Sequence, residues 1–229
     1  MYGYPAGVYS DALSRADYDP PVLPVEIVPG LLRWTAPHPD RNPNAPPGSA
    51  DDWGQDVGSV LYEVPDAVVL IDPLLPIEDR AGFLDWLDAL IGARPVSILT
   101  TIRWHRRDRE ELAERYEPNT APRAWNAIPR GVVPKPLRGA GETMYWLPDV
   151  AALVPGDRLI GAPGGGLQVA PQSWLEAVHV NRPGLVELLR PLVELPIERV
   201  LVSHGEPVLH DGRAALVRAI AEAKAEAEA

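Results

Sequence analysis

Three polar residues fall at the ends of predicted strands, where side chains from different strands can meet at one edge of a sheet. They are Asp72, Asp157 and His204. Taken singly, each has an ordinary structural explanation, as a turn residue for the two aspartates and as a hydrogen-bonded histidine near the core for His204. The chain has no cysteine, so His, Asp and Glu are its only strong metal ligands. Mixtures of His and carboxylate suit Zn, Mn or Fe.

Runs of short strands, interrupted by helices, must position these residues. Proline and glycine turns separate four β-type segments near the start, which predicts an antiparallel meander over residues 25–28, 31–35, 58–63 and 67–71. Apolar spacing and punctuation predict helices over 77–91, 108–116, 184–195 and 212–229, and strands over 96–101, 143–147, 150–154 and 199–202. Strands do not alternate strictly with helices, so the pattern favours an α+β fold, an αββα sandwich, over a doubly wound parallel sheet.

One domain over residues 25–229 accounts for this pattern, preceded by an extended or disordered arm over 1–24. The last turns of the C-terminal helix carry no apolar stripe, so we expect them to fray. Five prolines prevent regular structure over residues 37–48, and a long loop of this kind often belongs to a binding site. The glycine-rich stretch 161–166 lacks phosphate-binding spacing and is interpreted as a flexible loop.

Charge and hydropathy exclude two classes of partner. Among 229 residues, 32 Asp and Glu outnumber 21 Lys and Arg, which gives a net charge of -11 and a surface that repels a phosphate backbone. The N-terminus does not resemble a secretory signal, and no apolar run approaches the ~20 residues of a membrane span. We therefore expect a cytoplasmic protein that binds a small molecule rather than nucleic acid or a membrane, and the sequence leaves its oligomeric state open.

The order of five short segments carries a more specific signal. It resembles the ordered motifs of the metallo-β-lactamase superfamily. The matching segments are Val69-Leu70-Ile71-Asp72, Ile98-Leu99-Thr100-Thr101, Gly141-Glu142-Thr143, Leu153-Val154-Pro155-Gly156-Asp157-Arg158-Leu159 and Val200-Leu201-Val202-Ser203-His204-Gly205. The resemblance implies an αββα sandwich with a metal site at one edge of its paired sheets. It also implies that Asp157 and His204 occupy metal-ligand positions and that Asp72 supports the site without binding metal.

The chain departs from the family where most ligands should stand. The family has His-x-His-x-Asp-His after the strand that ends in Thr, and this chain has Ile-Arg-Trp-His-Arg-Arg over residues 102–107. In one register, Ile102 and Trp104 replace the two histidines, and Arg106 and Arg107 replace the Asp-His pair. Cations at those positions oppose the binding of two zinc ions.

A second register moves His105 onto the second histidine position, with Arg103, Arg107 and Asp108 at the others. The sequence leaves both registers open. Further along, Glu142 replaces the histidine of the family's Gly-His-Thr. In neither register does the His-x-His-x-Asp-His motif retain more than two of its four ligands.

These departures give three hypotheses. In the first, the two-metal centre is lost, no cofactor is needed, and Arg106 or Arg107 pairs with Asp157 or Glu142. The resulting pocket would bind a small, anionic molecule, with Trp104 and Trp34 as its apolar wall.

In the second hypothesis the protein is a hydrolase with a single Zn, Mn or Fe ion that cleaves an ester, thioester or lactam. Its ligands are Glu142, Asp157 and His204, with His105 as an additional candidate. In the third, the chain is a non-catalytic subunit whose partner docks on the loop 37–48. The sequence assigns no catalytic residue and no substrate.

Overall fold

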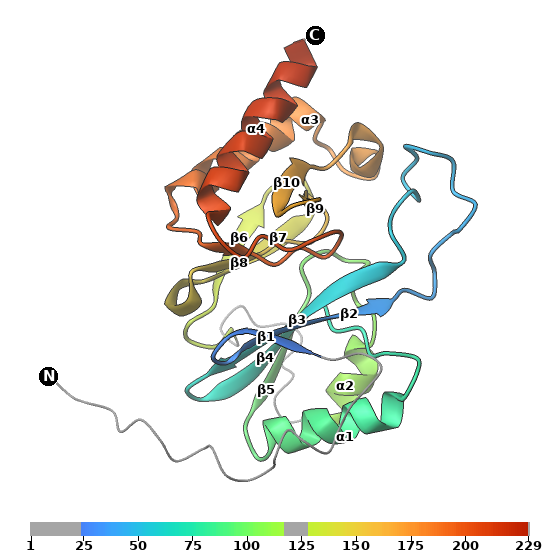
Figure 1. Ribbon diagram of the computed structural model, residues 1–229, viewed down its shortest axis with the longest axis vertical. Helices are drawn as coiled ribbons and strands as arrows, with labels where there is room; N and C mark the ends of the chain where they lie inside the picture. Colours follow the sequence, from blue (N-terminus) through green and yellow to red (C-terminus); the bar gives the residue numbers. More distant parts are fainter. Residues whose placement is uncertain (1–23, 117–127, 229) are drawn as a thin grey trace, which may run out of the picture.

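Two mixed sheets lie face to face in this computed structural model, with helices on both outer sides (Figure 1). The structure describes residues 24–116 and 128–228. The first sheet has the order β1-β2-β3-β4-β5 and comprises β1 (Val25–Val28), β2 (Leu31–Pro37), β3 (Asp56–Val64), β4 (Ala67–Ile71) and β5 (Val96–Leu99). The second has the order β11-β8-β7-β6 and comprises β6 (Val133–Leu137), β7 (Glu142–Leu147), β8 (Ala152–Val154) and β11 (Arg199–Val200). A separate antiparallel hairpin consists of β9 (Leu159–Ala162) and β10 (Gly166–Val169).

The helices form the outer layers. They are α1 (Arg80–Ile91), α2 (Arg109–Arg115), α3 (Arg182–Leu189) and α4 (Gly212–Glu228), with 3-10 turns η3 (Pro148–Val150), η4 (Gln172–Leu175) and η5 (Arg190–Glu194). None of the helices in the described ranges is both long and apolar enough to cross a lipid bilayer. The order of the layers is therefore α1 and α2, first sheet, second sheet, then α3 and α4 (Figure 1).

Alternating side chains explain why four layers form. In β4, Val68 and Leu70 pack in the cluster that faces α1, whereas Val69 and Ile71 pack in the cluster between the sheets. Successive residues of a strand point to opposite faces, so a strand that is apolar at every position must be covered on both sides. This pattern confirms the αββα sandwich predicted from the sequence.

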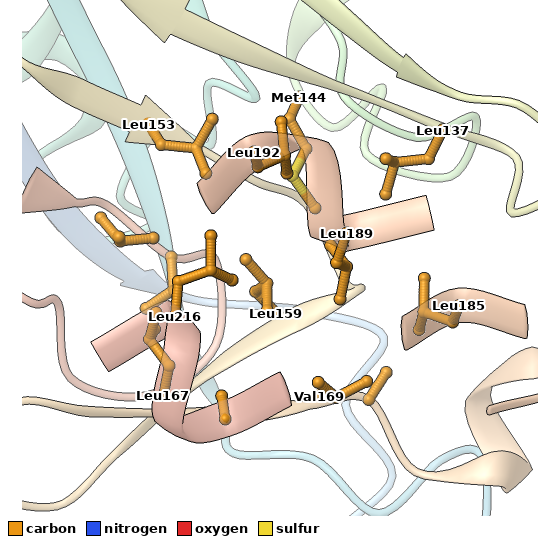
Figure 2. Packing of buried hydrophobic residues seen from close by; sticks show 14 of the residues in the cluster. Leu137, Met144, Leu153, Leu159, Leu167, Val169, Leu185, Leu189, Leu192 and Leu216 are labelled. Atoms are coloured by element: carbon orange, nitrogen blue, oxygen red, sulfur yellow. The ribbon is translucent and has the colours of Figure 1, made fainter. Parts of the chain in front are cut away.

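The outer face of the second sheet is covered in the same way. Figure 2 shows Leu185, Leu189 and Leu216 of the two C-terminal helices in one cluster with Met144 and Leu153 of the sheet. These residues are buried, and each buried leucine contributes about 1.5–3 kcal/mol through removal of its side chain from water. The helices thereby fix the second sheet and the loops that leave its edge.

Several local predictions needed correction. The glycine-rich stretch 161–166 is the end of one strand and the turn of the β9–β10 hairpin, with Gly164 and Gly165 at positive φ, and not a flexible loop. Strand β6 was not predicted because it contains Pro134 and Pro136, which are compatible with its edge position. The predicted helix over 184–195 ends as α-helix at Leu189 and continues as the 3-10 turn η5.

The remaining boundaries agree more closely. The meander is confirmed, and β1 and β4 have the predicted bounds. Helix α1 begins three residues later than predicted because Asp79 caps it by accepting a hydrogen bond from the Gly82 N–H. The predicted arm, apart from residue 24, lies outside the described residues, and fraying at the end of α4 stays a prediction.

Candidate functional site

The ends of the two sheets are joined at one edge. The Gly58 N–H donates to the Ser203 carbonyl at 2.7 Å, and the Thr143 N–H donates to the Thr101 carbonyl at 2.8 Å. The loops that follow β4, β5, β8 and β11 therefore open at the same place. The strand-end residues singled out in the sequence, Asp72, Asp157 and His204, are all buried there.

His105, in the turn between β5 and α2, links the two aspartates. Its Nδ1 lies 2.9 Å from Asp72 Oδ2, and its Nε2 lies 2.9 Å from Asp157 Oδ1. Asp72 itself is fixed because its Oδ1 accepts the Thr101 backbone N–H at 2.8 Å. Burial lowers the pKa of His105, but the carboxylates of Asp157 and Asp72 outweigh it and raise this pKa to about 9.

Asp157 lies in the turn between β8 and β9 and is the centre of the cluster. Its Oδ1 is 2.9 Å from His105 Nε2 and 3.3 Å from His204 Nε2, and its Oδ2 accepts a hydrogen bond from Trp104 Nε1 at 2.5 Å. Burial disfavours the ionised carboxylate, but the charge and hydrogen bond of His105 and the contact with His204 hold the pKa of Asp157 well below its usual range. Asp157 is therefore an anion at neutral pH.

His204 completes the cluster from the second sheet. His204 is 8% exposed, and its Nδ1 is buried without a hydrogen-bond partner in the described structure. The rings of Trp53 and Trp174 lie edge-on to the imidazole, with centroids at 5.6 Å and 5.2 Å. The two tryptophans were not predicted as site residues, and only the position of Trp53 just beyond the proline-rich loop hinted at its role.

Glu142 does not join this cluster, contrary to its predicted role as a ligand. Its carboxylate accepts the backbone N–H groups of Gly156, Asp157 and Arg158 at 3.0, 2.7 and 3.0 Å. Burial raises the pKa of Glu142 to about 7, and the charge of Asp157 adds to this effect. Arg158 and the backbone donors oppose it. Glu142 thus stabilises the turn that contains Asp157, and both of its oxygens already accept backbone hydrogen bonds.

The two adjacent arginines have different positions, and neither forms the predicted ion pair with Asp157 or Glu142. Arg106 is exposed and pairs with Glu110 one helical turn away. Arg107 is partly buried, and desolvation lowers its pKa. Its guanidinium donates to three groups, the carbonyls of Gly58 and Asp72 at 2.7 Å each and Ser203 Oγ at 2.6 Å. Arg107 joins the loops beneath the site, and Arg106 belongs to the surface.

A simple substitution checks the position of Arg106. We expect Arg106→Ala to change the free energy of unfolding by less than about 0.5 kcal/mol, because exposed i,i+4 pairs contribute about 0.3–0.5 kcal/mol. Urea unfolding of this variant and of the unsubstituted protein measures the difference. A loss of 2 kcal/mol or more, about the cost of an unpaired buried group, would contradict the exposed position.

A cavity of about 640 Å³ opens beside the cluster. His204, Trp53 and Trp174 form part of its wall, and Gly48, at the end of the predicted proline-rich loop, lies at its edge. Of the loop 37–48, only Gly48 lines this cavity, and the role of the loop in binding stays a prediction. Trp34 is not part of the wall: it is buried in the core against Phe83. Trp104 is 40% exposed.

Solved structures with the same arrangement of layers are metallo-β-lactamases. FIM-1 from Pseudomonas aeruginosa, in its mono-zinc form, superposes with a TM-score of 0.58 at 12% identity, over 90% of this chain and 97% of that one. A metallo-β-lactamase from Erythrobacter litoralis has a TM-score of 0.57 at 14% identity, over 89% of this chain and 96% of that one. TMB-1 has a TM-score of 0.59 at 12% identity, over 91% and 100%. The chain has the metallo-β-lactamase fold. No protein-family model and no curated protein sequence matches it.

In this metallo-β-lactamase fold, three side chains fit one metal ion. His105, Asp157 and His204 each offer one ligand atom, and these atoms lie within 4.8 Å of one another. Two tetrahedral ligands at zinc bond lengths lie about 3.4 Å apart, close to the 2.9 and 3.3 Å between the nitrogens and Asp157 Oδ1. That oxygen faces the ring nitrogens of both histidines. Among the residues that the structure describes, no second group of three such ligands exists.

Proposed function

We propose that this protein binds a single divalent metal ion through His105, Asp157 and His204 and hydrolyses a small ester, thioester or lactam. The convergence of the three ligand atoms on one buried point carries the proposal. Three protein ligands leave a coordination position for water or substrate, which is the arrangement of catalytic rather than structural zinc sites. When bound, the ion would act as a Lewis acid and activate water.

The surrounding residues orient these ligands. Asp72 contacts His105 at Nδ1, which leaves Nε2 for the metal, and this carboxylate–histidine arrangement is typical of metal sites. Trp104 holds Asp157 through Oδ2, so Oδ1 is the oxygen that faces both histidines and would bind the metal. To act as a ligand, His105 must release the proton from Nε2. Without metal, His105 keeps that proton, and its protonated ring lies between the carboxylates of Asp72 and Asp157.

The proposal includes loss of the two-metal centre. The residues over 102–107 supply only His105 to the cluster, and Glu142 is bound to the backbone. Of the three ligands, His204 lines the cavity, and we expect a small substrate to reach the site from there. Residues 37–48 border the cavity only through Gly48, so docking of a partner on the rest of this loop is a separate hypothesis.

Elemental analysis of protein purified without chelator or affinity tag tests the proposal. We expect about one equivalent of Zn, Mn or Fe, and hydrolysis of at least one member of a panel of esters, thioesters and lactams that a chelator abolishes and added metal restores. Protein that binds no metal at saturating supply would contradict the proposal. It would favour instead a metal-free pocket that binds a ligand without hydrolysis.

A further inference from the structure

The cavity beside His204 is lined by two different kinds of group. Its charged residues come mainly from the loop before β3 and from α4, and its aromatic residues are Trp53 and Trp174. A volume of about 640 Å³ is in the range of pockets for small molecules. Its composition therefore bears on which small molecule could enter.

The charges of the lining are mostly negative. Asp52, Glu222 and Glu226 line the cavity, and Arg182 is the only Arg or Lys among the described lining residues. Arg182 is already paired with Glu226, so its charge is matched within the wall. The lining keeps a surplus of negative charge, in a protein whose net charge is -11. Such a wall repels carboxylates and phosphates and attracts cations.

The aromatic groups and His204 point to a bound molecule independently of these acids. Trp53 and Trp174 flank His204, whose side chain is nine-tenths buried and whose Nδ1 lacks a hydrogen-bond partner in the described structure. Tryptophan is the aromatic side chain that attracts an ammonium group most strongly, by about 0.5–2 kcal/mol according to its desolvation. Aromatic rings together with carboxylates are the usual means of binding such a group.

We propose that this cavity binds a molecule that carries an ammonium group, with that group beside Trp53, Trp174 and the carboxylates of Asp52 and Glu222. This inference rests on the proposed function, because it makes the cationic molecule the substrate or product at the cluster of His105, Asp157 and His204. It also replaces the anionic ligand expected from the sequence. Arg106 is on the surface and the partly buried Arg107 lies under the site, and neither lines the cavity.

Three probes of nearly equal shape test this charge preference. Choline is cationic, 3,3-dimethylbutan-1-ol is its neutral isostere, and 3,3-dimethylbutanoate is the anionic counterpart. Isothermal titration of each into the full chain, with zinc and without it, gives the dissociation constants. We expect choline to bind about tenfold or more tightly than the neutral isostere, and the anion not to bind.

Paired variants locate the preference. Asp52→Asn combined with Glu222→Gln should reduce the advantage of choline to less than about threefold. Asp66→Asn combined with Glu187→Gln removes the same number of charges outside the cavity lining and should leave the advantage of choline unchanged. Equal binding of choline and the neutral isostere, tighter binding of the anion, or no binding of choline would overturn the inference.

The metal content of the same samples separates this inference from the proposed function. A preference for choline in protein that binds no metal would support the cationic cavity and contradict the hydrolase. One equivalent of metal without any preference for choline would support the metal site of the proposed hydrolase and contradict the cationic cavity.

Discussion

Replacing His204 by alanine should lower the affinity of the protein for zinc by more than about 100-fold. Loss of a residue that only orients a metal ligand already costs about 10–100-fold, and His204 is assigned as a ligand itself. Competition with a chromophoric chelator measures the affinity, and hydrolysis should disappear together with the metal. Asp157→Ala should behave in the same way, because Asp157 Oδ1 lies between the nitrogens of both histidines.

The matched control is His210→Ala, the same substitution at a histidine that is exposed and pairs with Glu198. It should leave zinc affinity within about twofold. A thermal unfolding curve for each variant shows whether the fold is retained. If His204→Ala folds and keeps its zinc affinity, His204 is not a ligand, and the single-metal site must be abandoned.

A second pair of variants compares the two proposed ligand sets. The sequence favoured Glu142 as the third ligand, and the structure favours His105. We expect His105→Gln to lose zinc about as severely as His204→Ala. Glu142→Gln should lose tenfold or less, because it affects only the turn that carries Asp157. The opposite order would restore the ligand set inferred from the sequence.

The fold was predictable because it depends on repeated patterns. Strand β4 appears in the sequence as a fully apolar run between Asp66 and Asp72, and such a run requires a layer on each side. Asp157 and His204 were found because they follow strands, and strand ends meet at sheet edges. Strand β6 was missed because propensity excludes prolines from strands in general, whereas an edge strand tolerates them.

The choice between His105 and Glu142 could not be predicted, because it depends on the path of a single turn. Residues 102–107 form no regular element, and Arg107 has a φ of 43°, in the left-handed region that non-glycine residues rarely adopt. The three hydrogen bonds of its guanidinium hold that conformation. With Arg107 directed beneath the site, His105 faces Asp157 and Arg106 faces solvent. None of these orientations follows from sequence spacing.

The stability of the metal-free protein should fall by about 3 kcal/mol as the pH rises from about 6.5 to 9. The pKa of His105 rises from 6.5 to about 9 on folding, so the folded state holds a proton that the unfolded chain has already released. The stabilisation is complete below pH 6.5 and is lost as the pH rises through about 9. The pKa of Glu142 also rises on folding, from 4.5 to about 7, but the loss of stability that this causes falls mainly below this pH range.

Urea unfolding at intervals across this range measures the loss, and the His105→Gln variant should lack it. Saturating zinc should abolish this pH dependence, because the metal and the proton compete for Nε2 and zinc affinity rises about tenfold per pH unit below the pKa, which offsets the loss of the proton. A proton therefore stabilises the cluster of Asp72, His105 and Asp157 at low pH, and a metal ion would stabilise it at high pH. Metal-free stability that is flat from pH 7 to 9 would show that His105 is neutral when folded. The interaction of His105 with Asp72 and Asp157 would then involve a neutral imidazole and not the protonated ring that we infer.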